Sequence, residues 1–184
     1  YTLLGDEPGT AANGKNKFER VINEAQSAEL IYLINKADIR NGELKKEDVK
    51  AINEYIKAVK AAENKNLKDV VVSAYASPDG ATDLNTNLAA KREGSAKNYI
   101  DKQLKKANAE ANVITKSTPE DWEGFKAAME KSDIQDKELI LKVLAMYSDP
   151  DVREKEIKNL SAVYKVIAEE ILPPLRRSVI TVNS

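Results

Sequence analysis

The chain has 184 residues, with 29 Lys and Arg against 30 Asp and Glu, so its formal net charge is −1. A balance this even gives no long-range field that would draw the whole chain onto nucleic acid or anionic lipid. The sequence contains no Cys and no His, which excludes disulfides, Cys nucleophiles, Ser-His-Asp triads and the usual zinc sites. No apolar run approaches the roughly 20 residues needed to span a bilayer, so membrane contact is expected only through segments outside this sequence.

The N-terminal part of the chain is predicted to be a tether that leads into a strand. Residues 1–16 hold three of the seven glycines and show no apolar period, which is typical of a flexible linker. Three apolar residues fit either a short strand or a turn of helix: Phe18, Val21 and Ile22. The apolar run at 29–34 predicts a strand covered on both faces, and the Asn41-Gly42 pair predicts a turn.

Two helices and two strands are predicted in the next part of the chain. Apolar residues recur every three to five positions from Leu44 to about Asn64, which indicates a helix. The segment 70–76 predicts a strand that ends in the turn 77–80. A second long helix is expected to be capped at Thr82 or Asp83. Its predicted apolar face consists of Leu84, Leu88, Ala96, Tyr99, Ile100 and Leu104. Residues 113–116 then predict a short third strand.

The segment 118–172 is predicted to contain three or four short helices. Thr118-Pro119-Glu120-Asp121 combines a capping hydroxyl, a proline and two acids, which is typical of a helix start. Asp149-Pro150-Asp151 repeats this device. Pro173-Pro174 must end the helical segment, and 179–182 predicts a last strand. This order of elements predicts an α/β fold, an α+β sandwich in which helices pack on one sheet, with 17–184 forming a single domain.

The usual motifs of enzymes and nucleic-acid-binding proteins are absent from the sequence. There is no glycine-rich phosphate loop, and neither G-x-S-x-G nor S-x-x-K occurs. The acidic pair Glu169-Glu170 fits a solvated helix face, because neighbouring helical residues diverge by about 100°. Asp79, Asp83 and Asn85 lack the spacing of a calcium loop. Lysines alternate with acids, and aromatics make up only 5% of the chain. We therefore expect no catalysis, no metal, no cofactor and no nucleic-acid partner.

One constellation of residues resembles a known family. The strand ending at Tyr75 leads into Ser77-Pro78-Asp79-Gly80, and Asn85-x-x-Leu88-Ala89-x-x-Arg92 follows at the start of a helix. This pattern resembles the OmpA-like peptidoglycan-binding domain family, in which a strand ends in Thr-Asp, a glycine follows, and N-x-x-L-S-x-x-R-A opens a helix. The residues that match in register are Gly80, Asn85, Leu88 and Arg92. The segments NKADIR at 35–40 and Arg176-Arg177 are also similar to the family.

The resemblance covers about residues 28–118 and 173–183. It implies a β-α-β-α-β core with one mixed sheet and helices on one face, and the segment 118–172 would be a helical insertion before the final strand. It also implies noncovalent anchoring to peptidoglycan at the periplasmic side of the outer membrane. The peptide stems of this polymer contain diaminopimelate, whose side chain carries an ammonium and a carboxylate on one carbon.

The resemblance implies a role for each residue of the constellation. Arg92 would grip the carboxylate with its planar guanidinium. Ser77 and Asp79 would accept hydrogen bonds from the ammonium, and Asn85 would hold the turn that contains Gly80. The family's aspartate falls on Ser77, which lacks the charge, so affinity should drop or recognition should shift. We expect the Arg92 guanidinium to be exposed in a pocket close to acceptors from residues 77–79, and a buried Arg92 that is paired to an acid would contradict the binding hypothesis.

Two alternatives remain open from the sequence. Arg92 could pair with Glu93 or Asp83 on an inherited fold that has lost wall binding. The chain would then serve as an assembly module with an envelope protein as its partner. Its working surface would come from the apolar residues of the insertion: Trp122, Phe125, Met129 and Tyr147. Core packing is the other use of these four side chains.

Overall fold

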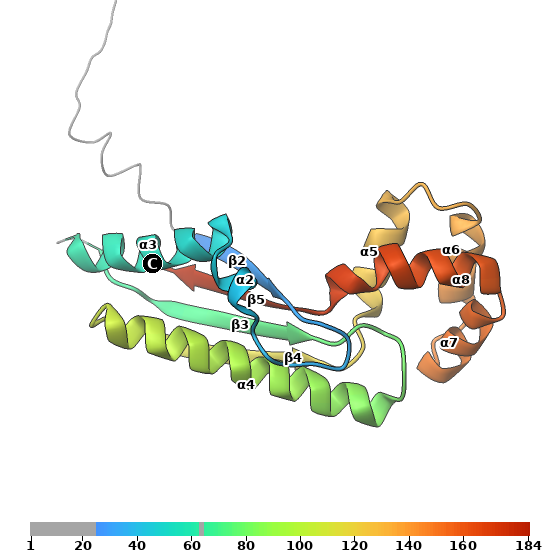
Figure 1. Cartoon of the computed structure of the whole chain (residues 1–184), viewed down its shortest axis with the longest axis horizontal. Helices are drawn as coiled ribbons and strands as arrows, with labels where there is room; N and C mark the ends of the chain where they lie inside the picture. Colours follow the sequence, from blue (N-terminus) through green and yellow to red (C-terminus); the bar gives the residue numbers. More distant parts are fainter. Residues whose placement is uncertain (1–24, 63–64) are drawn as a thin grey trace, which may run out of the picture.

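The computed structural model describes residues 25–62 and 65–184. Its centre is a four-stranded sheet with the order β2-β5-β3-β4 (Figure 1). The strands are β2 (Ala25–Ile31), β3 (Asp69–Tyr75), β4 (Asn112–Thr118) and β5 (Arg177–Asn183). β5 runs antiparallel to both of its neighbours, whereas β3 and β4 are parallel, so the sheet is mixed. The predicted α/β fold is confirmed. The predicted tether and the undecided segment at Phe18, Val21 and Ile22 lie outside the described residues.

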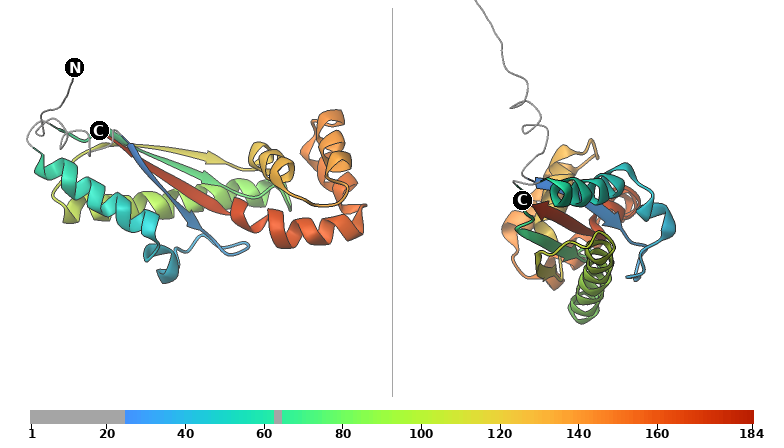
Figure 2. Two further views of the ribbon diagram at one scale, coloured as in Figure 1. Left: turned by 90° about the horizontal axis from the view of Figure 1, so that it is seen from above. Right: turned by 90° about the vertical axis from the view of Figure 1, so that its left-hand side faces the viewer.

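The helices α3 (Glu47–Ala61) and α4 (Thr82–Lys106) cover the same face of the sheet (Figure 2). Strand residues alternate between buried and half-buried positions in β3 and β5, as expected when only one face is covered by helices. The buried positions pack against the helices and form the sheet core, which includes Leu30, Val70, Val72, Ile180 and Val182 from the strands and Ile52, Ile56 and Ile100 from the helices.

The first strand ends earlier than the apolar run predicted. Leu33 and Ile34 lie in the following loop and are about half exposed, so the expectation of a strand reaching residue 34 is wrong. The backbone of Ile31, the last residue of β2, bonds to two side chains of the segment that follows. Its N–H donates to Glu43 Oε1 at 2.8 Å, and its carbonyl accepts from Arg40 Nη2 at 3.2 Å. The predicted turn at 41–42 is in fact the start of a short helix, α2 (Asn41–Leu44).

The start of α4 also differs from the prediction. Ala81 is the N-cap, and no side chain caps the helix. The Thr82 hydroxyl donates instead to Glu120 Oε2 at 2.8 Å. Leu84 is 66% exposed, so its assignment to the buried face is wrong. The buried face consists of Asn85, Ala89, Arg92, Ala96, Ile100 and Leu104. Two of the three residues in its first half, Asn85 and Arg92, are therefore polar.

The segment between β4 and β5 forms a helical unit (residues 122–175) at one end of the sheet (Figure 1). Its α-helices are α5 (Trp122–Lys131), α6 (Lys137–Met146), α7 (Pro150–Lys158) and α8 (Ser161–Val166). A π-helical turn (Ile167–Ile171) and a 3-10 turn (Pro173–Leu175) complete the unit. The prediction of three or four short helices is confirmed.

One of the two predicted helix caps in the helical unit is confirmed. Asp149 caps α7 by accepting from the Asp151 N–H at 2.9 Å. The cap of α5 is Asp121, which accepts from the Gly124 N–H at 3.0 Å, and not Thr118. Thr118 is unavailable because it pairs with Tyr75 in the sheet.

The helical unit has an apolar core of its own. Phe125 and Met129 are buried there among Ile140, Ile157 and Ile167. Trp122 packs edge-on against Phe125, with 5.4 Å between the ring centroids. Phe125 and Met129 are therefore core residues, and the hypothesis that they form a docking face is wrong. Among the residues that the structure describes, no helix combines the length and the apolar character needed to cross a membrane.

Candidate ligand-binding site

The turn between β3 and α4 brings four of the five sequence-predicted site residues together. The Ser77 hydroxyl donates to Asp79 Oδ1 at 2.5 Å, and Asn85 Nδ2 donates to the Asp79 carbonyl at 3.1 Å. Gly80 has a φ of +92°, a conformation that favours glycine. The expected hydrogen bond from Asn85 to the backbone of the turn is therefore present. These contacts fix the conformation of the turn, in which Asp79 is half-buried.

The fifth residue, Arg92, lies beneath this turn and is fully buried. Its Nε donates to the Lys36 carbonyl at 2.9 Å, Nη1 to the Tyr75 carbonyl at 3.0 Å and Nη2 to the Leu33 carbonyl at 3.2 Å. These three acceptors come from the loop after β2 and from the end of β3. The guanidinium therefore ties two separate segments of the chain to α4.

Tyr32 supports Arg92 from the side of β2. The guanidinium carbon lies 5.1 Å from the centroid of the Tyr32 ring, within the range of a cation–π interaction. The Tyr32 hydroxyl and the Ser178 hydroxyl each contact the Arg92 carbonyl at 3.3 Å. Burial lowers the pKa of Arg92 to about 10, so the side chain stays protonated at neutral pH.

The burial of Arg92 corrects one expectation from the sequence. The guanidinium is not exposed in a pocket, and its hydrogen bonds go to backbone carbonyls rather than to residues 77–79. It is also not paired with an acid. Glu93 and Asp83 form no ion pair with Arg92, and within the described residues no carboxylate does. Arg92 is thus a buried cation held by neutral acceptors.

A groove of about 550 Å³ opens between the loop after β2 and the first turns of α4. The loop contributes Asn35, Lys36, Ala37 and Asp38, and the helix contributes Leu84, Asn87, Leu88 and Lys91. Lys36 and Lys91 are both exposed. The groove therefore offers two accessible ammonium groups and one carboxylate beside apolar surface, directly above the segments that Arg92 ties together.

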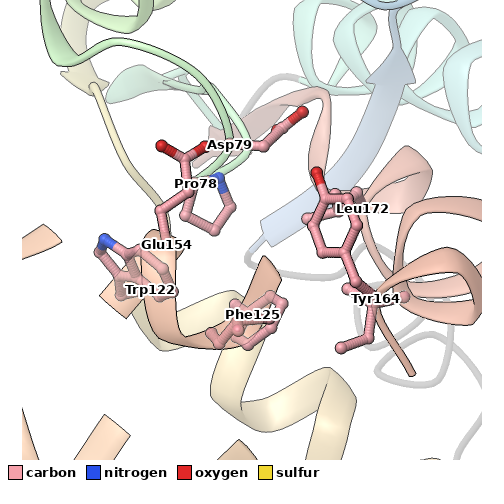
Figure 3. A pocket seen from close by; sticks show the side chains of 9 residues that line it. Pro78, Asp79, Trp122, Phe125, Glu154, Tyr164 and Leu172 are labelled. Carbon is pink, nitrogen blue, oxygen red and sulfur yellow. The ribbon is translucent and has the colours of Figure 1, made fainter. Parts of the chain in front are cut away.

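On its other side the turn meets the helical unit. Pro78 and Asp79 face a void of about 10 Å³ that is lined by residues of the helical unit, which is room for about one water molecule. In Figure 3, Glu154 and Trp122 lie on one side of this pocket, and Tyr164 and Leu172 lie on the other. The Gly80 N–H donates to Glu154 Oε2 at 2.5 Å. The space between Asp79 and the helical unit is therefore almost filled.

Sequence reasoning missed several residues of this region. Glu154 is 74 positions from Gly80, and nothing in the local pattern of α7 indicates the contact. Tyr32 belonged to an apolar run, and its hydroxyl gave no sign that it meets the Arg92 backbone. The signal that could have indicated a buried Arg92 is the spacing of Asn85, Ala89, Arg92 and Ala96, which lie on one helical face.

The site shows no arrangement for a metal. Among residues 25–62 and 65–184, no group of three or more acidic side chains could hold a metal ion. Comparisons with known proteins find no family model that matches this chain and no matching curated protein. The resemblance to the OmpA-like family therefore stays a prediction that rests on residues 75–92 and the shorter segments named above.

Proposed function

We propose that this chain is a non-catalytic module that binds the peptide stems of peptidoglycan, as its resemblance to the OmpA-like family implies. The observation that carries the proposal is the clamp made by Arg92. Its guanidinium holds the loop at 33–36 and the end of β3 in fixed positions beside α4. A rigid pair of loops at the end of a sheet is the scaffold on which binding residues are commonly presented.

In this proposal Arg92 is a positioning residue, and exposed side chains contact the ligand. Lys36 and Lys91 in the groove would pair with carboxylates of the stem. Asp79 with its partner Ser77, in the turn that precedes the helical wall of the groove, would accept from the ammonium. Leu84 and Leu88 would pack against the alanine methyl groups of the stem. The groove itself carries both signs of charge, through Lys36, Lys91 and Asp38, which fits a zwitterionic ligand. Modest affinity would be amplified by the many repeats of the wall.

The experiment that tests the proposal is cosedimentation of the chain with purified sacculi. A Lys36→Gln/Lys91→Gln variant should lose about tenfold in apparent affinity, because ion pairs of exposed lysines contribute up to about 1 kcal/mol each. The matched control is Lys102→Gln/Lys105→Gln, which removes the same charge from exposed positions at the other end of α4. Equal sedimentation of the two variants would contradict the placement of the ligand in this groove.

A second candidate function is an assembly module of the cell envelope. The observation in its favour is an exposed apolar strip on α6, where Leu139 is 44% and Met146 is 63% exposed. These residues are seven positions apart and therefore share one face of the helix. This function is favoured if the unmodified chain fails to bind sacculi but retains an envelope protein, and if a Leu139→Glu/Met146→Glu variant releases that protein.

A further inference from the structure

The helical unit presses against the turn that carries the proposed site. One hydrogen bond joins them, from the Gly80 N–H to Glu154 Oε2 at 2.5 Å. Next to it, Thr82 Oγ1 donates to Glu120 Oε2 at 2.8 Å, in the segment that leads into the helical unit. The void between Pro78, Asp79 and the apolar wall of the helical unit holds about 10 Å³. A ligand of several heavy atoms cannot enter this space without a displacement of one side (Figure 3).

Glu154 occupies a position suited to the carboxylate of a ligand. Backbone N–H groups that precede a helix attract anions, and Gly80 lies two residues before the start of α4. Its N–H is already taken by the Glu154 carboxylate, whose side chain is 19% exposed. An external carboxylate that approached this amide would have to displace Glu154.

Lys158 is the ion-pair partner of Glu154 on α7. Its Nζ lies 3.3 Å from Glu154 Oε2 and 5.8 Å from the centroid of the Tyr164 ring. Asp79 lines the same pocket as Tyr164 and Glu154. Burial raises the pKa of the Tyr164 hydroxyl, and the charges of Lys158, Asp79, Glu154 and Arg176 also act on it.

We propose that α7 acts as an intramolecular competitor: Glu154, which is paired with Lys158, presents to Gly80 of the turn the carboxylate that a diaminopimelate side chain would present. This inference rests on the proposed function of the turn. The ligand then reaches Asp79 and Gly80 fully only when the helical unit moves off the turn. Because part of the binding free energy is used for this opening, the observed affinity is lower than that of the open turn.

The contact itself is tested without any ligand. Amide hydrogen exchange at Gly80 should become about tenfold faster in Glu154→Gln, because a charge-assisted hydrogen bond is replaced by a neutral one. Glu156→Gln is the matched control, since it removes the same charge from the same helix at a residue that makes no hydrogen bond or ion pair within the described part of the chain. Unchanged exchange at Gly80 in Glu154→Gln would overturn the closure of the turn by α7.

Competition is tested by calorimetric titration with a soluble muropeptide that contains diaminopimelate. Glu154→Gln/Lys158→Gln should bind about tenfold more tightly than the parent chain, whereas the control Lys155→Gln/Glu156→Gln should bind like the parent. Weaker binding by the first variant would overturn the inference, because Glu154 and Lys158 would then belong to the ligand site. Absence of binding by all three proteins would refute the proposed function and the competition with it. The exchange measurement would still decide separately whether α7 closes the turn.

Discussion

Asp121 and Arg177 form an ion pair, with 2.6 Å between Asp121 Oδ2 and Arg177 Nη1, although they are 56 residues apart. Asp121 directly precedes the helical unit, and Arg177 is the first residue of β5, just after it. The guanidinium carbon of Arg177 also lies 4.0 Å from the centroid of the Tyr75 ring at the end of β3. This ion pair thus joins the two ends of the helical unit at the point where they meet the sheet.

Substitutions of Asp121 should separate its contribution as the cap of α5 from its contribution as the ion-pair partner of Arg177. Asp121→Asn retains an acceptor for the Gly124 N–H but loses the charge that faces Arg177, and we expect a loss of about 2 kcal/mol in the free energy of unfolding. Asp121→Ala also removes the cap and should cost about 1 kcal/mol more. Urea denaturation measures both values. Identical losses in the two variants would mean that the cap contributes nothing.

Gly124→Ala should destabilise the chain even though alanine favours helix. A Cβ at Gly124 would overlap Asp121 Oδ2, which is held by Arg177. We expect the free energy of unfolding to fall by roughly 1–3 kcal/mol, which is typical of overpacking. Gly94→Ala is the control, because a Cβ there meets no atom within 4 Å, and this change should stabilise α4 by up to about 1 kcal/mol. Thermal unfolding of the two variants should shift in opposite directions.

Arg92→Lys should be strongly destabilising although the charge is kept. A lysine ammonium lacks the planar fork that reaches three carbonyls from two segments, so buried acceptors lose their partners. We expect the free energy of unfolding, measured by urea denaturation, to fall by about 2–4 kcal/mol. The free energy of unfolding of the exposed control Lys102→Arg should stay within about 0.5 kcal/mol of the parent value. A loss below about 1 kcal/mol in Arg92→Lys would contradict the role of the clamp.

Asn85→Asp should loosen the turn. The change keeps the size of the side chain but removes the Nδ2 donor and brings a charge close to the Asp79 carbonyl. We expect the free energy of unfolding to fall by about 1–3 kcal/mol. We also expect faster amide hydrogen exchange at residues 77–81. Asn87→Asp makes the same change at an exposed position two residues later and should leave exchange in the turn unaffected. Faster exchange in both variants would assign the effect to added charge alone.

Glu43 should make part of the stability dependent on pH. Burial acts to raise the pKa of Glu43, but the hydrogen bond from Ile31 and the charges of Lys46 and Arg40 outweigh it and lower the pKa. A lowered pKa in the folded state stabilises above the ordinary value of 4.5, and this contribution is lost as the pH falls through the lowered pKa. Glu43→Gln should therefore cost about 1–2 kcal/mol at pH 7 and progressively less below pH 4.5. A difference that is the same at pH 7 and pH 3 would contradict this assignment.

The sequence predicted the elements whose signals are local. The β-branched run of β3 and the Asp149-Pro150 cap both identify structure within a few residues, and both are confirmed. The prediction was wrong where a distant contact decides the outcome. Thr118 lost its expected cap role because it pairs with Tyr75. Leu84 is exposed because the polar residues Asn85 and Arg92 take the buried face of α4.

The candidate site was predictable in its composition and only partly in its geometry. Ser77, Asp79, Gly80 and Asn85 are close in sequence, so their meeting in one turn follows from the turn itself. The burial of Arg92 depends on the loop at 33–36, which is more than 50 residues away. The contact between Gly80 and Glu154 depends on the packing of an independent helical core, which no local pattern encodes.

The register of the sheet has a mechanical consequence. Ala25 pairs with Asn183 at one end of the sheet, whereas β3 leads into the candidate turn at the opposite end. A pulling force applied between Ala25 and a ligand held at the turn would run parallel to β2, β5 and β3. The interstrand hydrogen bonds lie across that direction, so they would bear the load in shear and together, rather than opening one after another as in a zipper. A wall anchor built in this way would resist tension along its long axis.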